Sequence, residues 1–64
     1  MIEYAIRVIE PDESEATVHV DEWDGDGSAH LFITRPGAGI SVVMQRGDVI
    51  QLIKALGEIV RATQ

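Results

Sequence analysis

The last third of the chain carries apolar side chains at steps of three and four residues. Between residues 48 and 62 they are Val49, Leu52, Ile53, Leu56, Ile59 and Val60. At 100° per residue these positions fall within an arc of about 120°, and polar side chains lie opposite. Asp48 can accept a backbone hydrogen bond as the N-cap, and Gln51 completes a capping box. The pattern therefore predicts an amphipathic helix over 48–62 that needs an apolar surface to cover.

The preceding part of the chain instead alternates apolar and polar residues, as half-buried strands do. The predicted strands are residues 2–9, 16–23, 29–35 and 39–45. Turn-forming segments separate them, namely the acidic stretch 10–15, Asp24-Gly25-Asp26-Gly27 and Pro36-Gly37. Residues 1–64 are therefore predicted to form one small α+β domain. Its fold would be a four-stranded antiparallel β-meander with the C-terminal helix packed on one face (ββββα).

Turn lengths predict the register of this sheet. A two-residue turn at Pro36-Gly37 and a four-residue turn at 24–27 place the aliphatic strand residues together on one face. If the second turn had five residues instead of four, Phe32 would lie on that face. With the four-residue turn, the opposite, open face carries Ala5, His19, Trp23, His30, Phe32 and Val43.

Charge is distributed unevenly along the chain. The run from 10 to 26 sums to −8 and contains no Lys or Arg, and the remainder contributes +2, for a net charge of −6. Such a density of carboxylates repels phosphate backbones and attracts basic protein surfaces. With Trp23 and Phe32 as apolar anchors, the predicted partner-binding acids are Glu10, Asp12, Glu13, Glu15, Asp21, Glu22, Asp24 and Asp26.

Composition excludes several classes of protein. The chain has no cysteine, so it has neither disulfides nor a thiolate metal site. No apolar run reaches the ~20 residues that span a bilayer, and no signal pattern begins the chain. We therefore expect a cytoplasmic protein, in a bacterial host cell if a phage encodes it. A hydrophobic content of 45% is too high for a disordered chain.

Candidate catalytic and metal-binding motifs are incomplete. Calcium-loop frames that begin at Asp24 or Glu22 put Arg35 or Ile33 where a bidentate Glu is needed. Two histidines, His19 and His30, with one nearby carboxylate make a poor zinc site. The serines lack a paired base, and the glycines after Arg35 lead into a strand rather than a helix. The sequence therefore predicts no enzyme activity, cofactor or metal.

Two features leave alternatives open. The aromatic side chains of the open face are either ordinary surface residues or a partner surface, and the partner can be a second copy of the chain. Gly57 interrupts the helix at a cost of roughly 1 kcal/mol. It is either tolerated, needed for close helix–sheet packing, or needed for close approach of another backbone in a helix-mediated dimer.

Two resemblances accompany these patterns. The segment RPGAGISVVMQRGDVIQLIKALGEIV, a Pro-Gly turn followed by a strand and an amphipathic helix, resembles the single-stranded-DNA-binding transcriptional coactivator fold. That resemblance implies dimerisation through the helix and DNA binding on the strands. In size, lack of cysteine and acidic block, the chain is similar to the anti-CRISPR and anti-restriction inhibitors of phages and mobile elements. This second resemblance implies carboxylates that replace DNA phosphates, as in a DNA mimic, or dock on a basic groove.

The function that we expect from the sequence is a non-enzymatic acidic binding protein. It would inhibit a CRISPR or restriction effector by docking on the basic surface that binds nucleic acid, without binding nucleic acid or membrane itself. The alternatives are a dimerising subunit or scaffold domain and a coactivator-like module that binds single-stranded DNA.

Overall fold

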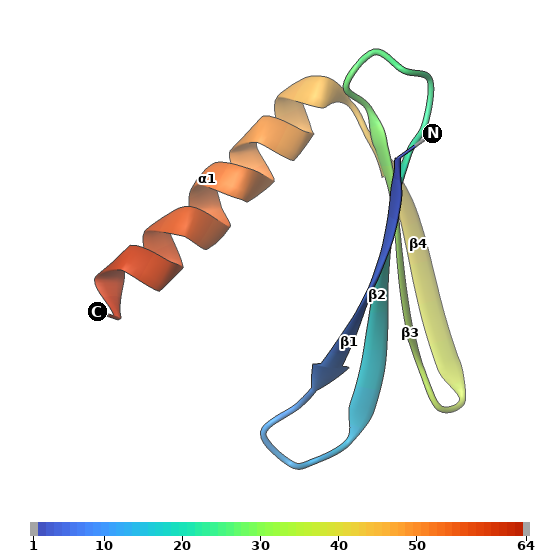
Figure 1. Cartoon of the computed structure of the whole chain (residues 1–64), viewed down its shortest axis with the longest axis vertical. Helices are drawn as coiled ribbons and strands as arrows, with labels where there is room; N and C mark the ends of the chain where they lie inside the picture. Colours follow the sequence, from blue (N-terminus) through green and yellow to red (C-terminus); the bar gives the residue numbers. More distant parts are fainter. Residues whose placement is uncertain (1, 64) are drawn as a thin grey trace.

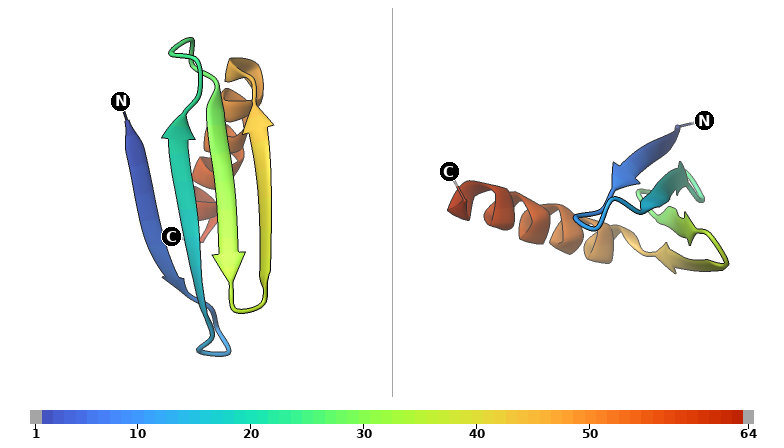
Figure 2. Two further views of the ribbon diagram at one scale, coloured as in Figure 1. Left: turned by 90° about the vertical axis from the view of Figure 1, so that its right-hand side faces the viewer. Right: turned by 90° about the horizontal axis from the view of Figure 1, so that it is seen from below.

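Four strands and one helix follow one another in the chain. The computed structural model describes residues 2–63. Its elements are β1 (Glu3–Ile9), β2 (Glu15–Glu22), β3 (Ala29–Arg35), β4 (Ala38–Met44) and α1 (Arg46–Ala62). The strands form one antiparallel sheet in the order β1-β2-β3-β4 (Figure 1 and Figure 2). The predicted α+β meander with a C-terminal helix is confirmed.

The strand register also agrees with the turn lengths. Arg35 pairs with Ala38 across the Pro36-Gly37 turn, and His19 pairs with Phe32. The Trp23 backbone N–H donates to the Ser28 carbonyl at 3.1 Å, which closes the four-residue turn. Phe32 therefore lies on the open face, here called the outer face. The inner face carries the aliphatic set and Tyr4, namely Tyr4, Ile6, Val8, Ala16, Val18, Val20, Leu31, Ile33, Ile40 and Val42.

The helix begins earlier than its sequence pattern indicated. Its N-cap is Gln45, which makes no side-chain capping hydrogen bond, and Asp48 lies within the first turn. The predicted capping box of Asp48 and Gln51 is therefore wrong. At its position in the first turn, the Asp48 carboxylate still favours the helix, because it lies near the partial positive charge of the N-terminus.

The predicted packing of the helix on the sheet is also wrong. Only its first turns approach the inner face, where Val49 and Ile53 line a recess with Tyr4, Val20, Ala29 and neighbouring residues. Beyond them α1 diverges from the sheet, so that helix and sheet form a wedge (Figure 1, and Figure 2, right). Ile53 is 65% exposed and Leu56 is 54% exposed. Gln45 alone separates β4 from α1 and is extended, a link shorter than the roughly two to six residues usual between a strand and the helix that packs on its sheet.

The described chain consequently lacks a hydrophobic core of its own. Within residues 2–63, Ala29 is the one buried hydrophobic residue. The Cα radius of gyration is 13.1 Å, whereas a compact domain of this length has about 10.7 Å. Two apolar surfaces therefore remain exposed: the inner face of the sheet and the stripe of α1. They face each other across the opening of the wedge.

Candidate functional site

Four aromatic and imidazole rings form a row across the outer face of β2 and β3. Ring centroids are 5.7 Å apart for Trp23 and His30, 6.3 Å for His30 and Phe32, and 5.7 Å for Phe32 and His19. The register explains the row: His19 and Phe32 are cross-strand partners, and His30 and Phe32 lie two residues apart on one strand. Trp23 is 55% exposed and Phe32 is 37% exposed. We call Trp23, His30, Phe32 and His19 the ring row.

Gly39 lies beside Phe32, the third ring of this row. Gly39 lies on β4 opposite Thr34. A Cβ atom built on Gly39 would lie 3.5 Å from Cε1 of Phe32. The Phe32 ring therefore extends over the backbone of the neighbouring strand and leaves its other side open to solvent. The ring row is a ridge rather than a pocket.

Four carboxylates lie at the end of the sheet where Trp23 is, and we call them the upper acidic cluster: Asp21, Glu22, Asp24 and Asp26. Asp21 is on the outer face beside the row, whereas Glu22 is on the inner face, where it lines the recess with Tyr4 and Val49. The Asp21 Oδ2 atom lies 3.6 Å from Nδ1 of His30. The Glu22 carboxylate accepts a hydrogen bond from the Ile2 backbone N–H at 2.9 Å. Within residues 2–63, neither Asp24 nor Asp26 takes part in an ion pair. These two charges are therefore available to a partner.

Ser28 orders the loop of this cluster. Its Oγ hydroxyl and its backbone N–H both donate to Oδ1 of Asp26, at 2.5 and 2.9 Å. The Ser28 hydroxyl, followed by the backbone N–H, lowers the pKa of the Asp26 carboxyl from its ordinary value of 3.8. Asp26 therefore keeps its charge further into the acidic range than a free aspartate.

The other four acids form the lower acidic cluster, at the β1–β2 loop: Glu10, Asp12, Glu13 and Glu15. Arg35 lies 3.1 Å from the Glu10 carboxylate, and Arg7 pairs with Glu15. The Ser14 hydroxyl contacts carboxylates of both Asp12 and Glu10 at 2.7 Å. Hydrogen bonds from Ser14, chiefly from its hydroxyl, lower the pKa of Asp12, and the charge of Arg35 adds to this effect. Two arginines thus offset part of the charge in this cluster.

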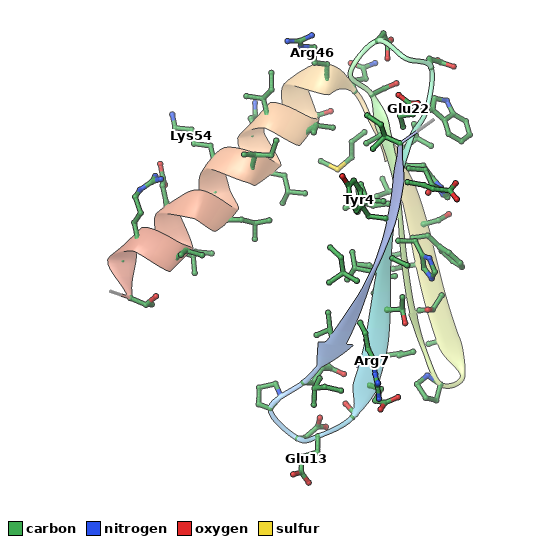
Figure 3. The ribbon with its side chains drawn as sticks, in the orientation of Figure 1. Tyr4, Arg7, Glu13, Glu22, Arg46 and Lys54 are labelled. Carbon is green, nitrogen blue, oxygen red and sulfur yellow. The ribbon has the colours of Figure 1, made fainter. Side chains whose placement is uncertain are left out.

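The structure separates the predicted acidic residues into these two clusters, at opposite ends of β2. Figure 3 shows Glu22 at one end of the sheet and Glu13 at the other. The eight residues of β2 span about 26 Å. Trp23 and Phe32 are brought together with the upper cluster, while the lower cluster lies at the far end of the same strand.

His19 and His30 belong to this surface, although the sequence placed them only on the open face and not among the partner-binding residues. The signal that could have found them was the register, which puts each imidazole beside an aromatic ring. No group of three or more metal-ligating side chains is present in residues 2–63. In the same part of the chain, no helix is long and apolar enough to cross a membrane.

No protein-family model matches this chain, and no curated protein or solved structure is significantly similar to it.

Proposed function

We propose that the chain is a non-enzymatic acidic binding protein that docks the ring row and the upper acidic cluster on a basic surface of another protein. The observation that supports this function is the exposed row from Trp23 to His19, with carboxylates beside its Trp23 end. Aromatic side chains are frequent interface anchors. Carboxylates around them select a basic partner and accelerate association with it.

Proteins that handle nucleic acid are the partner class that this chemistry fits. Their binding grooves are lined with Lys and Arg because they neutralise phosphates. A protein with a net charge of −6 that occupied such a groove would exclude the nucleic acid. The proposed activity is therefore inhibition of an effector such as a CRISPR or restriction complex, in which the carboxylates take the place of DNA phosphates.

Direct binding of single-stranded DNA is the competing use of an exposed ring row, because bases stack on aromatic side chains. The two arginines at the end of the sheet near His19 argue against DNA binding. Arg7 and Arg35 are both paired, with Glu15 and Glu10, so a phosphate would have to displace a carboxylate from each. We expect no DNA binding at physiological salt by gel shift. A shift at micromolar protein that weakens steeply with salt would support DNA binding instead.

The experiment starts with a pull-down from cells that contain CRISPR or restriction effectors, with the wild-type chain as bait. Affinity for the purified partner is then measured for two matched triple variants, each of which removes three negative charges. One is Glu22→Gln, Asp24→Asn and Asp26→Asn, and the other is Asp12→Asn, Glu13→Gln and Glu15→Gln. We expect the first variant to slow association by about tenfold or more. We expect the second to have a smaller effect, because that cluster is partly neutralised.

A third variant, Trp23→Ala, separates the role of the rings from that of the charges. Loss of this anchor should accelerate dissociation and change the association rate little. Circular dichroism of each variant checks that the sheet and helix are kept. If the upper triple variant and Trp23→Ala both bind the partner as tightly as the wild type does, the outer face is not the binding surface and the proposal fails.

A further inference from the structure

We infer that the inner face of the sheet and the apolar side of α1 together form the interface of an obligate, symmetric homodimer. In this dimer the apolar stripe of each α1 covers the inner face of the other copy's sheet, beyond the point where that copy's own α1 diverges from it. The ring row stays on the outside together with Asp21, Asp24 and Asp26 of the upper acidic cluster, and Glu22 lies at the edge of the inner face. The inference therefore does not depend on the proposed function.

The amount of exposed surface is the first argument. The chain exposes 5264 Å², whereas a compact monomer of 7.0 kDa exposes about 4,000 Å². Each copy therefore exposes about 1,200 Å² more than a self-sufficient domain does. Obligate homodimers bury about 1,000 Å² or more on each partner. The excess is the area that one such interface would remove from water.

The composition of the two surfaces is the second argument. The ten aliphatic and tyrosine residues of the inner face and the stripe of α1 carry no charge. The charged strand residues of that face, Glu22 and Arg35, lie at its two ends, where Glu22 accepts a hydrogen bond from the Ile2 backbone N–H and Arg35 pairs with Glu10. In Figure 3, Tyr4 lies on the side of the sheet that faces α1, and Lys54 points away from the sheet. Burial of both surfaces would therefore leave no unpaired charge inside.

The width of the apolar arc on α1 is the third argument. Ile50 and Gly57 lie beside the main stripe and widen the apolar arc to about 180°, more than the ~100° that one contact needs. Ile50 is exposed, and a Cβ atom on Gly57 would approach only the Arg61 side chain, at 3.3 Å. Close packing against the chain's own sheet is therefore not the reason for Gly57. An arc of this width suits a helix that makes two adjacent contacts, one with the partner's sheet and one with the partner's helix.

Geometry favours a second copy as the occupant. The 17 residues of α1 are about 25 Å long, close to the length of β2, so one helix can cover the strands from end to end. After the one-residue link at Gln45, α1 leaves its own sheet uncovered, and Leu56 and Ile59 remain exposed. Each copy thus has one uncovered sheet and one unpartnered helix. A two-fold arrangement satisfies both at once and closes, because each copy supplies what the other lacks.

The charge of the chain provides a signature of this dimer. Each copy carries −6, so two copies repel each other and salt screens that repulsion. We expect the dimer to become tighter as salt increases. Docking on a basic partner weakens under the same change. The salt response therefore separates a failure of the inference from a failure of the proposed function.

The wild-type mass is the primary test. Sedimentation equilibrium at micromolar concentrations should give twice 7.0 kDa, and the midpoint of thermal unfolding should rise with protein concentration. The mass should fall, or folding should be lost, in Leu56→Asp, which puts a charge on the apolar stripe. The matched control Lys54→Asp, on the opposite side of α1, should remain dimeric. A 7.0 kDa species that unfolds cooperatively, at a midpoint independent of concentration, would overturn the inference.

A second measurement fixes the arrangement without any substitution. Isotope-labelled and unlabelled copies are mixed, refolded together and examined by filtered nuclear Overhauser spectroscopy. We expect contacts between methyl groups of Leu56 or Ile59 in one copy and those of Val18 or Ile33 in the other. A dimeric mass without such contacts would also contradict the inference, because it would mean that the copies associate through strand edges.

Discussion

The side chain of Arg46, the first residue of α1, lies directly against Gly27 in the β2–β3 loop. A Cβ atom on Gly27 would stand 2.8 Å from Cγ and 2.9 Å from Cδ of Arg46, closer than side chains approach. Gly27 also has φ = +97°, a backbone conformation that residues with a Cβ atom adopt only at a cost. The contact connects the loop of the upper acidic cluster to the start of the helix, where α1 leaves the sheet.

This contact gives a stability prediction. Gly27→Ala should lower the free energy of unfolding by about 1–3 kcal/mol, because the substitution strains the backbone and displaces Arg46. Gly47→Ala is the matched control: Gly47 lies in the first turn of α1, and a Cβ atom there meets nothing within 4 Å. It should be neutral or stabilising by up to about 1 kcal/mol. Urea unfolding at one protein concentration measures both. A Gly27→Ala protein as stable as the wild type would contradict the account of this contact.

The Asp26 carboxyl gives a pH prediction. Its pKa in the folded chain lies below 3.8 because Ser28 donates two hydrogen bonds to the ionised form. A folded pKa below the unfolded value stabilises the fold above the unfolded pKa, and that contribution is lost as pH falls through the folded pKa. NMR titration should show the Asp26 pKa return part of the way toward 3.8 in Ser28→Ala, which keeps the backbone donor. Ser14→Ala, the control, should shift Asp12 and leave Asp26 unchanged.

Trp23 provides a natural reporter, since it is the sole tryptophan of the chain. It lies on the outer face and is 55% exposed, so its fluorescence should be that of a solvated indole and readily quenched by acrylamide. Dilution through the dimer–monomer range should leave the emission unchanged, because the inferred dimer does not cover this side chain. Docking of a basic partner should shift the emission to the blue and protect it from quenching. Quenching of Trp23 that weakens on self-association alone would place the ring row in the dimer interface instead.

The ion pair between Arg35 and Glu10 gives a kinetic prediction. Both side chains are partly exposed, and their nitrogen and oxygen lie 3.1 Å apart. Arg35→Ala should cost less than about 1 kcal/mol of stability. It should also accelerate association with a basic partner, since it frees a carboxylate of the lower acidic cluster. Lys54→Ala removes the same charge from α1 and should accelerate association less. Equal rates for the two variants would show that only the net charge matters.

The sequence determined the elements, their order and the strand register. Alternation of apolar and polar residues allows only one register that keeps aliphatic side chains on one face, and short turns allow little freedom between neighbouring strands. For that reason the pairing of His19 with Phe32 followed from turn lengths alone. The start of α1 did not follow, because Asp48 has the same preference for the N-cap as for the first turn.

Only the tertiary structure decided where the two apolar surfaces lie and which functional residues meet. Periodicity shows that a helix has an apolar side. It does not show whether the surface that packs against this side belongs to the same chain or to another. That depended on the single-residue link at Gln45, which directs α1 away from its own sheet. The run of acids likewise reads as one block in the sequence. An extended strand of eight residues separates it into two clusters about 26 Å apart, and only one of them lies beside Trp23.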